Sequence, residues 1–130
     1  MDLADDSVDG VLSRWSYMLM ADPAAALAET RRVLRPGGRL ALAVWGAPER
    51  NPWLGIAGMS LAQRGHIPPP EPAPAPGPFS LASARRLEGL LRDAGFAEVR
   101  TEEVPSRFDI PSVDEYIGLI ADTAGPVALV

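Results

Sequence analysis

The sequence contains no cysteine and no lysine, and its only histidine is His66. Without cysteine, the chain can form no disulfide, no thiolate zinc site and no cysteine nucleophile. All of its basic side chains other than His66 are arginines, and the formal net charge is −5. Nucleic-acid-binding proteins usually present a basic face, so this charge balance argues against nucleic acid as a partner.

Long apolar runs are also lacking, because no stretch is long enough to span a bilayer as a helix. The first residues are acidic, which does not fit a secretory signal peptide. We therefore expect a soluble cytoplasmic protein with no membrane contact, formed as a single domain over residues 1–130. No glycine-rich phosphate loop, Ser-His-Asp set or metal-ligand spacing is present. His66 lies in a loop rich in glycine and proline, where a histidine is more often solvated than a general base.

The most informative pattern lies between residues 8 and 45. Val8–Ser13 is a short apolar run, and Asp22-Pro23 is a capping pair that opens a helix. The helix is expected to stop at Arg35-Pro36-Gly37-Gly38, and Arg39–Trp45 is a second apolar run. Two such runs joined by a capped helix predict a parallel strand–helix–strand crossover. The predicted fold class is therefore α/β.

The segment after residue 45 contains a weaker helical pattern and then a dense run of prolines. Trp53 to Ala62 fits a short helix, with Asn51-Pro52 as its start signal. Residues 66–79 predict an extended loop, because proline at this density is incompatible with a helix or a strand ladder. The loop could be a lid over a substrate or a stiff surface connector, and the sequence leaves both open.

The remaining residues predict a helix, a strand pair and a last helix. Ser80 or Ser83 opens a helix in which leucines recur at helical spacing. Within residues 80–111, the segments 96–104 and 107–110 are predicted to form an antiparallel strand pair. In residues 112–130, Ser112 and Glu115 make a capping box for a last helix and tail.

Residues that follow the carboxyl end of a parallel strand often bind ligands. Here Arg14, Trp15 and Tyr17 could supply a charge, a stacking surface and a hydroxyl. The alternative is that Trp15 and Tyr17 pack beneath the helix while Arg14 faces water. Spacing alone does not decide between these two interpretations.

Two blocks of this sequence resemble class I S-adenosylmethionine-dependent methyltransferases, in the type 11 group related to ubiquinone and menaquinone biosynthesis enzymes. Asp5–Arg14 is similar to the acidic loop and fourth strand of that family, and Glu29–Leu40 to its next helix, turn and fifth strand. Leu87–Phe96 resembles the helix before the sixth strand. The resemblance implies a partial Rossmann-like sheet, S-adenosyl-L-methionine as the cofactor and methyl transfer to a small-molecule acceptor.

The resemblance also implies a site. Three residues match family positions near the methionine end of the cofactor: Ser13, Arg14 and Trp15. Four residues are expected to bind the acceptor: Tyr17, Trp45, Asn51 and Trp53. No catalytic side chain and no metal are implied, because displacement at a sulfonium methyl depends on positioning and needs no covalent nucleophile.

Three parts of the family's cofactor site have no matching position in this sequence. They are the glycine-rich turn after the first strand, the acidic residue that holds the ribose and the Asp that pairs with adenine. We therefore expect the carboxyl-terminal half of a methyltransferase domain, which alone would bind the cofactor weakly or not at all.

In such a half-domain, residues 8–13 would form an unpaired sheet edge that could pair with a complementary chain or with a second copy. The alternative functions are a non-catalytic interaction or scaffold module and an inactive relic. The sequence also leaves open that the chain is an α/β module unrelated to methyltransferases.

Overall fold

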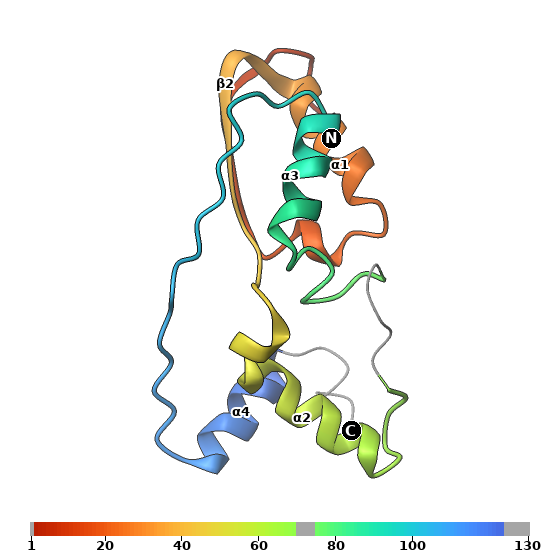
Figure 1. The fold of residues 1–130 in the computed structure, drawn as a ribbon, viewed down its shortest axis with the longest axis vertical. Coiled ribbons are helices and arrows are strands. Elements are labelled where there is room, and N and C mark those ends of the chain that lie inside the picture. The colour runs from red at the N-terminus through yellow and green to blue at the C-terminus, as the bar shows by residue number, and fades with distance from the viewer. Residues whose placement is uncertain (1, 70–74, 124–130) are drawn as a thin grey trace. The chain divides into compact units, whose positions relative to one another are not determined.

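The computed structural model describes residues 2–69 and 75–123. In this part of the chain the regular elements follow one another as shown in Figure 1: β1 (Val8–Arg14), the 3-10 helix η1 (Tyr17–Leu19), α1 (Pro23–Val33), β2 (Leu34–Ala43), the 3-10 helix η2 (Pro48–Arg50), α2 (Pro52–Gln63), α3 (Ala84–Asp93) and α4 (Val113–Thr123). These elements fall into two compact units. Unit 1 is Met1–Arg50 with Pro72–Glu102, and unit 2 is Asn51–Glu71 with Glu103–Val130.

Strands β1 and β2 pair in parallel and are joined through helix α1. Val11 lies opposite Leu40, and Ser13 lies opposite Leu42. The α/β fold class and the partial Rossmann-like sheet that the sequence predicts are therefore confirmed. The carboxyl ends of the two strands lie beside each other, because parallel strands run in the same direction.

Helix α1 begins where the sequence predicts. The Asp22 side chain accepts a hydrogen bond from the backbone N–H of Ala25 at 2.9 Å, and Pro23 occupies the first helical position. At the other end, the backbone of Leu34 is extended, so the helix passes directly into β2. The capping pair thus fixes the start of the crossover helix.

Strand β2 begins earlier than the sequence predicts. Val8 pairs with Leu34 but Gly10 pairs with Arg39, so the register shifts and residues 35–38 form an irregularity within the strand. A Cβ atom on Gly38 would lie 2.9 Å from the carbonyl oxygen of Arg35 and 3.1 Å from that of Asp9. The predicted turn therefore exists as a local irregularity that depends on a glycine, rather than as a break between helix and strand.

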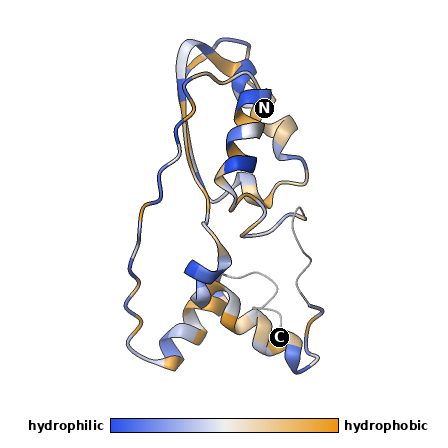
Figure 2. Ribbon diagram, in the orientation of Figure 1, coloured by the Kyte–Doolittle hydropathy of each residue, from blue (hydrophilic) through white to orange (hydrophobic). Residues whose placement is uncertain are grey.

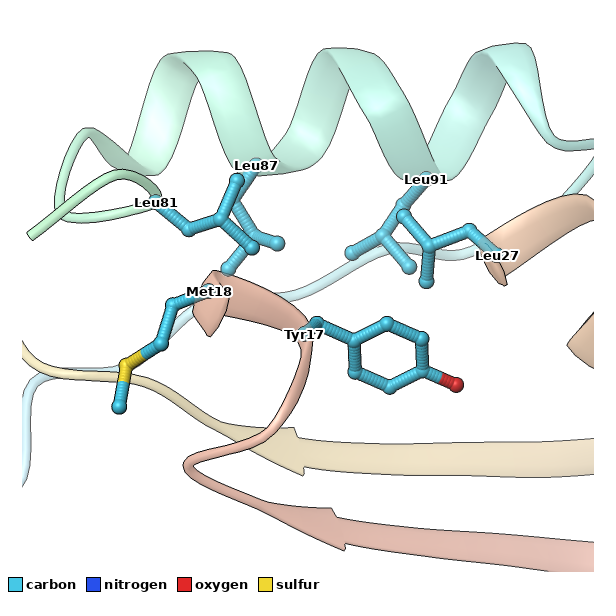
Figure 3. Packing of buried hydrophobic residues seen from close by; sticks show 6 residues of the cluster. All are labelled: Tyr17, Met18, Leu27, Leu81, Leu87 and Leu91. Carbon is cyan, nitrogen blue, oxygen red and sulfur yellow. The ribbon is translucent and has the colours of Figure 1, made fainter. Parts of the chain in front are cut away.

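The core of unit 1 lies between the sheet and helices α1 and α3 (Figure 3). Leu27 of α1 meets Leu87 and Leu91 of α3 in this core, and Leu40 and Leu42 of β2 pack against it. Side chains on the opposite face of the sheet are exposed, and Leu12 is 85% exposed. Among the described residues, the helices of unit 1 therefore cover one face of the sheet only.

Unit 2 contains α2 and α4, and both carry apolar side chains (Figure 2). The Tyr116 hydroxyl donates a hydrogen bond to the backbone oxygen of Trp53 at 2.6 Å, and the Trp53 ring lies 5.1 Å from that of Phe108. Ile120 is the most buried apolar residue of α4, at 2% exposed. These contacts link the start of α2 to α4.

The antiparallel strand pair predicted for residues 96–104 and 107–110 is wrong. Those residues form no strand, and the sheet of the described chain has two strands only. Residues 101–109 are all exposed, so their alternating pattern has no core face to bury. Glu98 has a φ of 52°, which interrupts extended backbone, and Pro105 cannot donate to a ladder.

The proline-rich loop is described in part, because residues 70–74 lie outside the described residues, as does the predicted tail at 124–130. Near its carboxyl end, Gly77 donates a backbone hydrogen bond to the Met18 oxygen at 2.9 Å, and the Ser80 hydroxyl donates to the same oxygen at 2.6 Å. Its function as a lid or as a connector stays a prediction, as does the single domain over residues 1–130. In the described part of the chain, no helix has the length and apolar character needed to cross a membrane.

Candidate functional site

The residue that follows β1 has an unusual backbone conformation. Trp15 has a φ of 58°, in the left-handed region that bulky side chains rarely occupy. Its backbone N–H donates to the Ala43 oxygen at 2.8 Å, which extends the hydrogen bonding of the two strands by one step. A non-glycine residue held at positive φ costs of order 1–3 kcal/mol and is common at functional sites. The chain turns sharply here and directs the next residues across the carboxyl ends of the strands.

Three side chains meet at this turn. The indole rings of Trp15 and Trp45 stack with their centroids 4.5 Å apart and an angle of 17° between the planes. The guanidinium carbon of Arg14 lies 4.5 Å from the centroid of the Trp15 ring, a cation–π distance. The sequence predicts all three as site residues, and the structure brings them together from the ends of two different strands.

Ser13, the last of the predicted cofactor-binding residues, pairs with a serine that sequence reasoning missed. The Oγ atoms of Ser13 and Ser16 are 2.6 Å apart, and the pair is partly buried. The spacing of three residues across a tight turn is the signal that could have indicated Ser16. Two hydroxyls thus lie next to the Trp15 turn.

Tyr17 lies in the core of unit 1, where it is 5% exposed. Its hydroxyl and the Thr30 Oγ1 are 2.5 Å apart, and Thr30 Oγ1 also donates to the Ala26 oxygen at 2.8 Å. Because a threonine hydroxyl has a single proton, Tyr17 must be the donor of the first hydrogen bond. This geometry corresponds to the packing alternative for Tyr17 that the sequence left open. Thr30 of α1 fixes the position of the Tyr17 side chain.

Asn51 and Trp53, the other two predicted acceptor-binding residues, belong to unit 2. Asn51 precedes α2 without a capping hydrogen bond from its side chain, and its backbone oxygen accepts from the Leu54 N–H at 3.1 Å. Trp53 packs on Phe108 and accepts a hydrogen bond from Tyr116 through its backbone oxygen. The structure therefore places Ser13, Arg14, Trp15 and Trp45 together and gives Asn51 and Trp53 separate local surroundings.

The acidic segment before β1 is held by arginines of α1 and β2. Arg32 forms ion pairs with Asp5 and Glu29, and Arg35 pairs with Asp9 at 2.7 Å. The hydrogen bond from Arg32 lowers the pKa of Glu29 to about 2. Asp5 of this segment and Asp9 within β1 thus connect the amino-terminal part of the chain to α1 and β2.

The side chains at the strand ends can bind and orient a ligand. They offer a flat aromatic surface, one guanidinium and two hydroxyls. Such a set suits a molecule with an anionic group and a flat or cationic part. The groove beside Ser13 and Arg14 also includes Glu29 in its lining, and this carboxylate is paired with Arg32.

Comparison with known proteins identifies the segment that carries this geometry. Residues 1–42, which contain β1, α1 and most of β2, match the family model described as "Methyltransferase domain". Residues 1–42 belong to the methyltransferase domain family. The resemblance indicated by the sequence is therefore confirmed.

Similar methyltransferases match far more than this segment. The chain is 32% identical over 117 residues to the malonyl-[acyl-carrier protein] O-methyltransferase of Methylococcus capsulatus, which covers 87% of this chain and 37% of that protein. It is 32% identical over 110 residues to methyltransferase UcsB of an Acremonium species, covering 85% of this chain and 35% of that protein.

An uncharacterized methyltransferase of Mycobacterium tuberculosis strain H37Rv is 39% identical over 89 residues, covering 66% of this chain and 35% of that protein. The chain thus spans 35–37% of the length of these methyltransferases.

Proposed function

We propose that this chain contributes to an S-adenosylmethionine-dependent methyl-transfer site at the carboxyl ends of β1 and β2. The observation that carries the proposal is the match of residues 1–42 to the methyltransferase domain. That segment ends at the strand edge where Arg14, Trp15 and Trp45 meet. The acceptor is proposed to be a small molecule.

Ser13, Arg14 and Trp15 are the proposed cofactor-binding residues, and their chemistry fits one end of the cofactor. A guanidinium such as that of Arg14 pairs well with a carboxylate such as that of the methionine part of the cofactor. When bound, S-adenosyl-L-methionine supplies a methyl group activated by the positive charge on its sulfur. The protein's contribution is then to orient this group and to exclude water.

Trp45 is the proposed acceptor-binding residue at the strand ends, and the roles predicted for Asn51 and Trp53 of unit 2 stay predictions. Trp45 is supported by its stack on Trp15, which brings it to the strand ends. We leave Tyr17 out of this set, because its hydroxyl is already used by Thr30 inside the core. Breaking that hydrogen bond to reach a ligand would leave a buried polar group unpaired.

The ribose and adenine of the cofactor have no matching residues in this sequence, so we propose that a further segment completes the cleft. That segment would supply the glycine-rich turn of the family, from a longer polypeptide or from a second chain. The described half-site alone is then expected to bind S-adenosylmethionine weakly or not at all.

Calorimetry tests this proposal with the 130-residue chain alone and mixed with a fragment that carries the first three strands of the Methylococcus capsulatus relative. We expect no micromolar binding of S-adenosylmethionine by the chain alone and measurable binding by the mixture. Loss of that gain in an Arg14→Gln variant, with retention in Arg100→Gln, would support the assignment of the site. Micromolar binding by the chain alone would contradict the half-site, and no binding by a mixture shown to associate would contradict the proposed function.

A second candidate function is that of an interaction module that pairs through β1. In the described chain β1 has β2 as its only strand neighbour, and Leu12 on the uncovered face is 85% exposed. A groove of about 450 Å³ also runs along β1 and α1, with Val11, Ala26 and Thr30 in its lining. An open strand edge with apolar neighbours favours pairing with another strand.

Sedimentation measurements distinguish this candidate, because pairing through β1 produces a dimer or a larger assembly. Leu12→Lys places a charge on the exposed strand and should shift the chain to a monomer. Leu19→Lys is the matched control, since Leu19 is 56% exposed on η1, outside the strand. A monomeric unmodified chain at high micromolar concentration would argue against the interaction module.

A further inference from the structure

Unit 2 contains a groove of about 1140 Å³ that is lined by residues of α2, α4 and the segment before α4. On α2 the lining residues include Trp53, Ile56 and Leu61, and on α4 they include Val113 and Ile117. These positions recur at the spacing of one helical face. The groove is therefore formed by the apolar faces of two helices within a single unit.

The apolar lining is unusually open to solvent. Ile56 is 53% exposed, Ile117 is 58% exposed and Val113 is 72% exposed. Single exposed apolar side chains are common on protein surfaces, but a contiguous apolar set along one groove marks a binding surface. Burial of these side chains by a ligand would be favourable by about 25 cal/mol per Å² of apolar surface.

Positive charge lies in the same groove. Arg64 and His66 belong to its lining, and no aspartate or glutamate does. Among the described residues, neither the Arg64 guanidinium nor the His66 imidazole forms a hydrogen bond or an ion pair. Arg32, Arg35 and Arg92, in contrast, each pair with a carboxylate. The groove thus combines an apolar floor with an available cationic group and has no carboxylate to oppose an anion.

We propose that unit 2 binds a medium-chain monocarboxylate, with its hydrocarbon chain along the helices and its carboxylate at Arg64. The apolar faces of α2 and α4 match the hydrocarbon, and Arg64 matches the single negative charge. The volume of about 1140 Å³ is somewhat larger than the roughly 300–1,000 Å³ that is common for small-molecule sites, so the groove can hold an extended hydrocarbon chain. This inference goes beyond methyl transfer, since it requires neither the cofactor nor the strand-end site.

The positive charge of Arg64 also favours a monocarboxylate over other occupants of the groove. A second copy that covered the apolar faces would place its own apolar helix against Arg64, which would then need a carboxylate to avoid burial of an unpaired charge. An uncharged apolar ligand would match the apolar faces but would make no use of the Arg64 guanidinium, which is exposed at the groove. A monocarboxylate provides both the apolar body and the counter-charge.

Titration calorimetry of the full chain tests the proposal with three probes of equal chain length: decanoate, 1-decanol and decyltrimethylammonium, each below its micelle concentration. We expect decanoate to bind about ten-fold more tightly than decanol, and the cation to bind most weakly. Arg64→Gln should remove the preference for decanoate while leaving decanol binding unchanged. Arg100→Gln is the matched control, since Arg100 is exposed and lies outside the groove.

Ile117→Asp provides a second variant, because it places a charge on the apolar floor at a position that is 58% exposed, where we expect little effect on folding. It should abolish the binding of both decanoate and decanol, with an unchanged circular dichroism spectrum. Equal affinity for all three probes, or an Arg64→Gln variant that keeps the preference for decanoate, would overturn the proposal. So would a chain whose groove is closed by self-association, detected as a dimer that decanoate does not dissociate.

Discussion

The stack of Trp15 on Trp45, with ring centroids 4.5 Å apart, joins the carboxyl ends of β1 and β2. Trp15 directly follows β1, and Trp45 lies two residues beyond the end of β2. A stacked aromatic pair stabilises a structure by about 0.5–1.5 kcal/mol beyond the burial of its surface. This contact helps to hold Trp15 in its left-handed conformation, at a φ of 58°.

Two substitutions of Trp15 separate the stability contributed by the stacked rings from the strain of its positive φ. Trp15→Ala and Trp15→Gly both remove the ring, so both should lower the free energy of unfolding by about 2 kcal/mol or more. Glycine adopts positive φ without the steric cost paid by alanine, so Trp15→Gly should be more stable than Trp15→Ala by about 1 kcal/mol. Urea unfolding followed by circular dichroism measures the difference. Equal stabilities would mean that the positive φ carries no strain.

Gly38 allows the irregular start of β2 to pass close to β1. A Cβ atom at this position would lie 2.9 Å from a backbone oxygen, so Gly38→Ala should destabilise unit 1 by about 1–3 kcal/mol. Gly46→Ala is the matched control, because a Cβ there would meet nothing within 4 Å. Thermal unfolding should show a clear loss for Gly38→Ala and little change for Gly46→Ala. Similar melting temperatures for the two variants would contradict the close approach.

The buried hydrogen bond from Tyr17 to Thr30 should respond differently to removal of its donor and removal of its acceptor. Tyr17→Phe removes the donor and should cost about 1 kcal/mol, since Thr30 keeps its hydrogen bond to the Ala26 oxygen. Thr30→Val removes the acceptor and leaves the buried Tyr17 hydroxyl unpaired, which should cost about 1–3 kcal/mol. In the double variant, the loss in free energy of unfolding should be smaller than the sum of the losses in the two single variants. Additive costs, measured by urea unfolding, would show that the two hydroxyls do not interact.

Local signals predicted the helices well, because their boundaries are encoded by side chains near the boundary itself. Asp22 caps α1 as expected, and the Ser83 side chain accepts from the Arg86 N–H at 3.4 Å at the start of α3. The Ser112 hydroxyl accepts from the Glu115 N–H at 3.2 Å, as one half of the predicted capping box. Each of these interactions spans three residues, so the sequence contains all the information that they need.

The errors fall where the structure depends on distant residues. Residues 96–110 alternate as a strand would, but a strand requires a partner edge and a face to bury, and the sequence shows neither. The irregularity at residues 35–38 depends on the close approach of Asp9, far away in the chain. A local pattern cannot distinguish this from a simple turn.

The candidate site was predictable in position more than in detail. The rule that ligands bind at the carboxyl ends of parallel strands selected Arg14 and Trp15, which contact each other, and Trp15 stacks on Trp45; their binding role stays a prediction. The same rule also selected Tyr17, whose side chain turns into the core to meet Thr30. Side-chain direction after a strand end depends on the turn, and the positive φ of Trp15 has no signal in the sequence.

The ion pair of Glu29 with Arg32 predicts an acid dependence of stability. The hydrogen bond from Arg32 lowers the pKa of Glu29 from 4.5 to about 2, so the unfolded chain takes up this proton before the folded chain does. The contribution is therefore complete above about pH 5 and is lost as the pH falls toward 2. Between pH 5 and pH 3, the melting temperature should fall more steeply for the unmodified chain than for Glu29→Gln. At pH 7 the variant should be the less stable of the two.

Glu102→Gln is the control for charge removal alone, since Glu102 is exposed and forms no ion pair with another described residue. The melting temperature of this control should follow that of the unmodified chain at each pH. Glu88, whose pKa is lowered by the Thr101 hydroxyl and by Arg92, remains in both variants and accounts for acid dependence that Glu29→Gln leaves behind. Parallel melting curves for Glu29→Gln and the unmodified chain would show that the Arg32 pair adds nothing to folding. A steeper fall in the unmodified chain and in Glu102→Gln than in Glu29→Gln would show that the Glu29 carboxylate stabilises α1 through its pair with Arg32 of the same helix.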